Sequence, residues 1–260
     1  MKMKSLLIIA LFTISLIFLA GCGNPEDHEN HIPTGPEDIT FGIADWVLVV
    51  SPVLDGKEPA ASIVMLYCLD VLHYPTSSDE LIVKIADDEI VMSNFFMIPG
   101  VYVGSAMLNQ GSTYNVEFFM NGISKLNTSL KIAYIPHATF PLNYSYNQPA
   151  TLNWTVAGNS QYQFAGAASE KEETDQSSEH VKQLDVSSRT YTIPANSVQD
   201  FGPGTEFRLG VDQVNYKLMN RIALMSIGSD TQSYYSSKTA DNVKQIADKA
   251  LMVFKRVVKR

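Results

Sequence analysis

The chain has 260 residues, and its 27 acidic against 19 basic side chains give a formal net charge of −8 at pH 7. A protein that binds nucleic acid through its phosphates needs an excess of Lys and Arg, so this balance argues against nucleic acid as a partner. The charge is uneven, because residues 238–260 hold seven basic and two acidic side chains. Such asymmetry predicts a basic tail with contacts of its own.

The first 21 residues have the organisation of a signal peptide. Lys2 and Lys4 give a positive start, and residues 6–20 form an almost unbroken apolar run of 15 residues. A membrane-spanning helix needs about 20 apolar residues, whereas a shorter run that ends in small residues is typical of a segment removed after export. We therefore expect a mature chain without residues 1–21, in which 17 basic side chains oppose 27 acidic ones.

The end of this run, Leu19-Ala20-Gly21-Cys22, resembles the lipobox of bacterial lipoproteins. The resemblance implies that the Cys22 thiol receives lipid, that cleavage occurs just before it, and that palmitate-like acyl chains hold the protein to a membrane. Each buried CH₂ contributes about 0.8 kcal/mol, so two or three chains would anchor it stably. Gly23 stands in place of the aspartate that is typical of inner-membrane retention. We expect a place in the cell envelope, at the outer membrane if the host has two membranes.

Residues 22–37 are predicted to be the lipidated cysteine and a flexible tether, because they are polar, contain three prolines and lack apolar periodicity. His28 and His31 lie in this tether. Nothing around them would pre-order a metal site, so we predict a solvated spacer and no bound metal.

Short β-rich runs and a hairpin turn predict a first β-sandwich over residues 38–137. Asn121-Gly122 follows a strand with alternating apolar side chains, and it predicts a tight hairpin because both turn positions need positive φ. Cys68 lies in an apolar run and is interpreted as a small core residue. The predicted strands cover residues 46–50, 62–72, 81–85, 114–120 and 130–134.

The pattern restarts after His137 and predicts a second sandwich over residues 138–236. Its predicted strands cover residues 151–156, 161–164, 189–193, 205–211 and 221–227. Residues 170–185 are acidic and rich in serine but lack the carboxylate spacing of a calcium loop, so we predict a solvated, mobile loop there. Two regions of roughly 100 residues, each with several short strands, predict a mostly β protein with two consecutive immunoglobulin-like β-sandwiches.

Within the second region, residues 150–154 (Ala-Thr-Leu-Asn-Trp) resemble the second strand of a fibronectin type III domain. Residues 190–195 and 203–211 resemble later strands of that family. The resemblance implies that Trp154 is the core tryptophan of a sandwich. It gives a fold and no activity, because such modules serve many functions.

The same family usually has a tyrosine where this chain has Phe207, so the resemblance implies a core position without the usual corner hydroxyl. In the first region, Tyr114 follows Gly111-Ser112-Thr113 and is the candidate for a corner tyrosine. We therefore predict Trp154, Tyr114 and Phe207 as structural core residues.

Residues 237–260 are predicted to form a basic amphipathic helix, because apolar side chains recur there at intervals of three and four. That stripe comprises Val243, Ile246, Ala247, Ala250, Leu251, Phe254, Val257 and Val258. The helix either packs on the second sandwich or lies on a membrane or a partner. Its candidate interaction residues are Leu251, Phe254, Lys255 and Arg256.

No H-E-x-x-H, G-x-S-x-G or P-loop pattern is present, and the five histidines are scattered along the chain. We therefore predict no catalytic residue and no cofactor. The sequence favours a non-enzymatic envelope lipoprotein that binds a protein or a glycan. The alternative is a structural subunit of an envelope assembly that docks through the C-terminal helix, and a hydrolase is the least favoured hypothesis.

Overall fold

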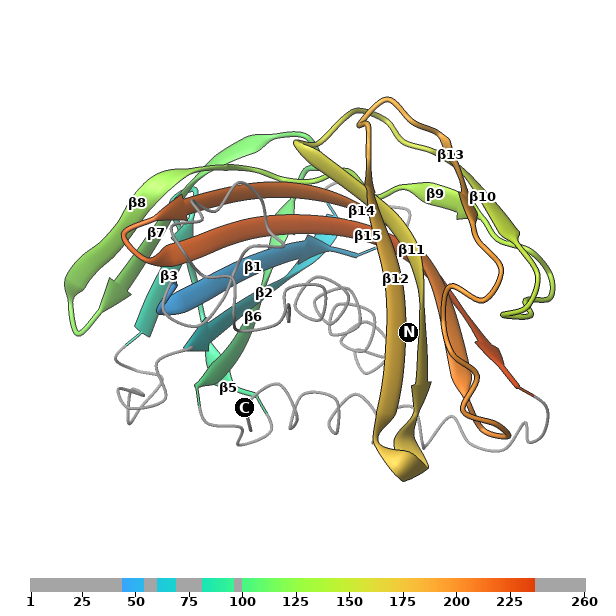
Figure 1. Ribbon diagram of the computed structural model, residues 1–260. Coiled ribbons are helices and arrows are strands. Elements are labelled where there is room, and N and C mark those ends of the chain that lie inside the picture. The colour runs from blue at the N-terminus through green and yellow to red at the C-terminus, as the bar shows by residue number, and fades with distance from the viewer. Residues whose placement is uncertain (1–43, 54–59, 69–80, 96–99, 237–260) are drawn as a thin grey trace, which may run out of the picture. The chain divides into compact units, whose positions relative to one another are not determined.

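The computed structural model describes residues 44–53, 60–68, 81–95 and 100–236 (Figure 1). These residues form β-strands and one short 3-10 helix, Glu172–Thr174, so the prediction of a mostly β protein is confirmed. The signal peptide, the tether and the predicted helix at 237–260 lie outside the described residues.

The described chain divides into two compact units, which are not consecutive in sequence. The β1 unit combines the described residues up to Tyr134 with Val214–Gly228, and the β10 unit combines Ile135–Gln213 with residues from Ser229 onward. Both units share β14 (Glu206–Met219) and β15 (Ile222–Tyr235), which are twice as long as the strands predicted there. The two strands are connected through Asn220 and Arg221, whose φ angles of 51° and 60° form a tight turn that the sequence did not signal.

The β1 unit contains two sheets. In one, β15, β1, β2, β6 and β5 lie side by side, and β1 pairs parallel to β15 but antiparallel to β2. The other has the order β4-β3-β7-β8. The strands are β1 (Trp46–Pro52), β2 (Ala60–Cys68), β3 (Leu81–Ile85), β4 (Asp88–Ile90), β5 (Ser93–Asn94), β6 (Val101–Leu108), β7 (Thr113–Met120) and β8 (Ile123–Lys131).

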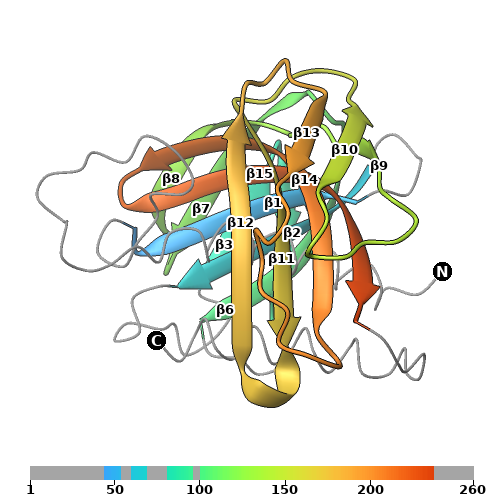
Figure 2. The same ribbon diagram turned by 45° about the vertical axis from the view of Figure 1, so that its right-hand side comes forward.

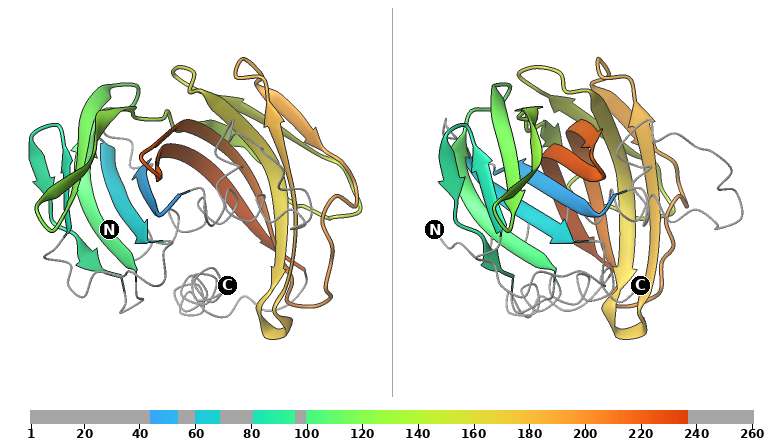
Figure 3. Two further views of the ribbon diagram at one scale, coloured as in Figure 1. Left: turned by 60° about the vertical axis from the view of Figure 1, so that its left-hand side comes forward. Right: turned by 90° about the vertical axis from the view of Figure 1, so that its left-hand side faces the viewer.

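These two sheets enclose one hydrophobic core, to which β1 contributes Trp46 and Leu48 and β7 contributes Phe118. Figure 3 shows the green β7 and β8 in a separate layer from the blue β1. Cys68 belongs to this core and is 8% exposed, as the apolar run predicted. The hairpin prediction is also confirmed, because Asn121 and Gly122 connect β7 to β8 with φ angles of 53° and 72°.

The β10 unit also contains two sheets around one core (Figure 2). One has the order β12-β11-β14-β15, and the other has the order β13-β10-β9. Leu152 of β10 and Leu209 of β14 are fully buried between them. The additional strands are β9 (His137–Thr139), β10 (Ala150–Thr155), β11 (Tyr162–Lys171), β12 (Gln176–Leu184) and β13 (Thr190–Ile193).

The prediction of a solvated loop over residues 170–185 is wrong. The segment completes β11 and forms β12, and the two strands pair in register from Gln163↔Leu184 to Lys171↔Gln176. Asp175 makes the turn with a φ of 60°. The polar composition led to the wrong prediction. Pairing with a neighbouring strand gives the backbone N–H and C=O groups their hydrogen bonds, and this does not depend on whether the exposed side chains are polar.

Candidate functional site

The candidate site lies on one face of the sheet in the β10 unit. Phe207, Leu209 and Val211 of β14, and Ala165 and Ala167 of β11, point into the core. Successive side chains of a strand point to opposite faces, so the residues between them lie on the other face of the sheet. We call this surface the charged face; its ionisable members are Glu170, Glu179, Glu206, Arg208, Asp212 and Tyr235.

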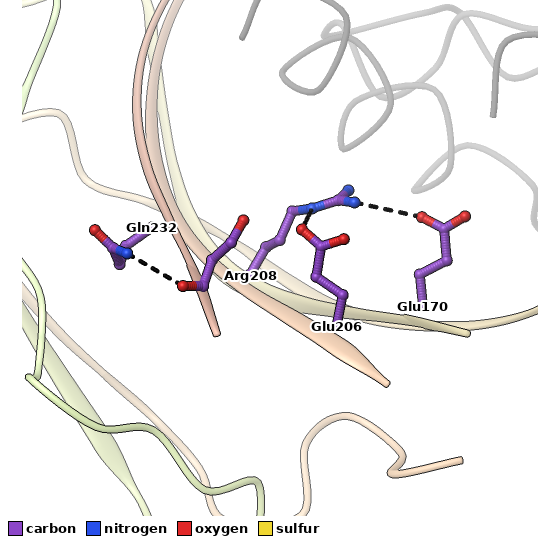
Figure 4. A network of polar contacts seen from close by, with 5 residues as sticks. Glu170, Glu206, Arg208 and Gln232 are labelled. Carbon is purple, nitrogen blue, oxygen red and sulfur yellow. Dashed lines mark hydrogen bonds and ion pairs between the residues drawn. The ribbon is translucent and has the colours of Figure 1, made fainter. Parts of the chain in front are cut away.

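Arg208 is the centre of an ion-pair network on the charged face (Figure 4). Its Nε lies 2.9 Å from Oε1 of Glu206, and a terminal guanidinium nitrogen lies 3.5 Å from Oε2 of Glu170. The side chains of Arg208, Glu206 and Glu170 are 11%, 9% and 19% exposed, so water screens the pairs only partly. Two carboxylates share one guanidinium, and the network is therefore negative on balance.

Tyr235 extends the network at the end of β15 and is 52% exposed. Burial raises the pKa of its phenol, and the charge of Glu206 and a hydrogen bond to that carboxylate raise it further. The phenol therefore stays protonated near neutral pH and offers an exposed polar ring beside a carboxylate pair.

Two further carboxyls on this face titrate near neutral pH. The hydroxyl of Ser229 donates a hydrogen bond to Asp212, but burial outweighs it and raises the pKa of Asp212 to about 7. Burial also raises the pKa of Glu179 to about 7. The negative charge of the face therefore increases as the pH rises through 7.

The three residues predicted to lie in the core, Trp154, Phe207 and Tyr114, differ in their burial and contacts. Trp154 is 3% exposed, and its indole N–H donates to Oε1 of Gln163 at 3.1 Å. Phe207 is 3% exposed and packs against the rings of Tyr144 and Tyr146. Tyr114 is half-buried, and its hydroxyl accepts a hydrogen bond of 3.0 Å from the N–H of Asn109.

The histidines of the described residues do not converge on a reaction centre. The ring of His180 stacks on Tyr191, with Nε2 2.8 Å from the phenol oxygen, and His137 is exposed on β9. In the described part of the chain, no three metal-ligating side chains come together. The same part holds no helix of a length and apolarity that would cross a membrane.

Several predicted site residues lie outside the described residues: Cys22, Leu251, Phe254, Lys255 and Arg256. Conversely, sequence reasoning missed the charged face. The signal was present, because Glu206, Arg208 and Asp212 share one alternation of a continuous strand. It was overlooked because the strand was predicted to end at residue 211.

No protein-family model matches the chain, and no curated protein matches it. Among solved structures, it is similar to the structure of the Yersinia pseudotuberculosis adhesin InvE, with 12% sequence identity and a TM-score of 0.24. The match covers 77% of this chain and 61% of that chain, so this chain spans less than two thirds of the length of that structure. At this identity and score, the similarity supports no conclusion about function.

Proposed function

We propose that the protein is a lipid-anchored lipoprotein of the bacterial cell envelope that acts as a non-enzymatic binding module. The observation that carries the anchor is the sequence Leu19-Ala20-Gly21-Cys22 at the end of a 15-residue apolar run. Lipid on Cys22 would hold the module at a membrane, at the outer membrane in a host with two membranes, while the polar tether leaves the β units free to meet a partner.

The two units are proposed to be immunoglobulin-like β-sandwiches, of which the β10 unit resembles fibronectin type III. The buried Trp154 on β10 supports the second assignment. The hydrogen bond from Asn109 N–H to the Tyr114 hydroxyl supports the first, because a corner tyrosine bonds to the backbone a few residues upstream.

A protein partner fits the charged face better than a glycan does. Sugar binding commonly uses several exposed aromatic rings, but among the large hydrophobic side chains exposed in the described residues Tyr235 alone is aromatic. The network around Arg208 instead offers two carboxylates that are only slightly exposed to water. Charge-assisted hydrogen bonds from basic side chains to such carboxylates are strong. The proposed partner therefore presents Lys or Arg. The alternative, a structural subunit that docks through residues 237–260, keeps the same anchor.

Two variants test the two parts of this proposal. Cys22→Ser should leave an unprocessed or soluble form, and membrane fractionation after signal processing measures it. A serine variant that remains as dependent on detergent as the wild type would refute the anchor.

For the binding part, crosslinking in cells followed by mass spectrometry should recover a partner whose yield falls at least fivefold in Glu170→Gln. The matched control is Glu117→Gln on β7 of the other unit, where Glu117 accepts hydrogen bonds from two asparagines. Equal yields from the two variants would exclude the charged face as the binding surface.

A further inference from the structure

The sheet of the β1 unit has a second face that is largely apolar along its central strands. Its polar member on β1 is the buried Ser51, whose hydroxyl donates to the carbonyl of Ile227. Trp46, Leu48 and Val50 of β1 point into the core between the two sheets. Val47 and Val49 therefore point the opposite way. In the register of the sheet, Val47 lies between Ala223 and Tyr67, and Val49 lies between Met225 and Met65. We call these six residues the apolar face.

This face is closed to water. Val47, Val49, Ala223 and Met225 are 0% exposed, Met65 is 1% exposed and Tyr67 is 6% exposed, although none of the six belongs to the core between the sheets. Neighbours on one sheet shield the sides of a side chain but not its end, so exposures this low require a covering layer. Burial declines toward β6, where Val103 is half-buried and Ser105 is exposed, so the cover is centred on β1 and β15.

We infer that the apolar face is a binding surface for an amphipathic helix and that its occupant is the protein's own C-terminal segment, residues 237–260. This inference goes beyond the proposed function and does not depend on the identity of any envelope partner. The segment has eight apolar residues at helical spacing, which need a surface of this kind in order to leave water.

The segment also starts in the right place and has the right length. It follows β15, the strand that carries Ala223 and Met225. Ten residues of strand separate Tyr235 from Met225, or roughly 33 Å at about 3.3 Å per residue. A helix over residues 240–259 is about 30 Å long, and the few residues before it add about 10 Å if extended. A tail that turns back along β15 would therefore bring Leu251 and Phe254 over the apolar face.

Charge favours the same path. Between Met225 and its end at Tyr235, β15 runs toward the part of β14 that carries Glu206, and Glu170 lies on the same face with Arg208 between them. That surface is negative on balance, while residues 238–260 carry an excess of five positive charges. Surface ion pairs contribute only about 0–1 kcal/mol each, so burial of the apolar stripe would supply most of the binding energy. The opposite charges would favour a path of the segment along the negative surface.

Photo-crosslinking in intact cells tests the inference on the full chain. A photoreactive phenylalanine analogue at position 254 should give an intramolecular product of monomer mass, with its crosslink in peptides that contain residues 46–50 or 222–228. The same analogue at Lys255, which is adjacent but off the stripe, should give that product at least fivefold less. A crosslink from position 254 to any other part of the chain would overturn the inference, as would a product of higher mass, which would identify a second copy or a partner as the occupant.

A second measurement covers the case in which the analogue disturbs folding. Leu251→Asp should release the segment and raise the fluorescence of a hydrophobic dye several-fold, while far-ultraviolet circular dichroism retains the β signal. Lys255→Glu is the matched control and should leave dye binding at the wild-type level. Unchanged dye binding in Leu251→Asp would mean that another element covers the face.

Discussion

Asp212 offers the sharpest test of the structure, because a carboxyl in its position must make stability depend on pH. The side chain is 4% exposed, and burial outweighs the Ser229 hydrogen bond to raise its pKa from the usual 3.8 to about 7. Between these two values the folded state binds the proton more tightly than the unfolded state does. The free energy of unfolding therefore falls as the pH rises from about 4 to about 7. Above that range Asp212 is ionised in both states, and the destabilisation of the folded state does not increase further.

The size of the effect follows from the same values. One pKa unit corresponds to about 1.4 kcal/mol, so the full penalty is about 4 kcal/mol, of which about 3 kcal/mol develops between pH 5 and pH 8. Asn retains the shape of the protonated carboxyl and still accepts the Ser229 hydrogen bond. Asp212→Asn should therefore remove this pH dependence and be more stable than the wild type at pH 8.

Urea unfolding of both proteins between pH 5 and pH 8 measures the difference directly. Glu179, whose pKa burial also raises to about 7, is present in both and cancels from the comparison. Asp185→Asn is the control, because the pKa of Asp185 is shifted in the opposite direction. Hydrogen bonds from Ser187 lower the pKa of this exposed carboxyl, so the stability that it contributes is lost only at acidic pH. Parallel stability curves for the wild type and Asp212→Asn would refute the buried placement of Asp212.

Two further predictions concern packing and strand pairing. Trp154→Ala should cost about 3–5 kcal/mol and unfold the β10 unit, because the ring is 3% exposed in its core; free quenching of Trp154 by iodide in the native protein would contradict this. Gly166→Ala should displace β12, because a Cβ there would collide with the backbone carbonyl of His180. In Gly122→Ala the new Cβ meets open space, so the variant should cost only about 1–2 kcal/mol, for the positive φ of that residue. Thermal unfolding compares the two glycine variants, and similar losses would argue against the β11–β12 pairing.

The features that the sequence determined by itself are those whose physical cause is local. The Asn121-Gly122 turn was predictable because a tight hairpin needs two residues that tolerate positive φ. Residues 81–85 formed the strand expected of them, because alternate side chains that are apolar favour a half-buried strand. The proposed lipobox at residues 19–22 is local as well, because its processing would depend on a linear segment of the chain.

Other features depended on which strands meet. Residues 170–185 look like a solvated loop in isolation, and only the neighbouring strand β11 makes them a strand by pairing with their backbone. The lengths of β14 and β15 were missed for the same reason, because their polar residues, including Asp212 and Gln213, are buried by contacts distant in sequence.

The charged face and the apolar face also arise only in the folded chain. Val47 and Met225 are separated by most of the sequence, and the parallel pairing of β1 with β15 places them on one face of one sheet. The sequence marked each of them as apolar. It did not reveal that their side chains would point away from the core between the sheets, because alternation fixes only which residues share a face, and tertiary pairing decides what that face meets.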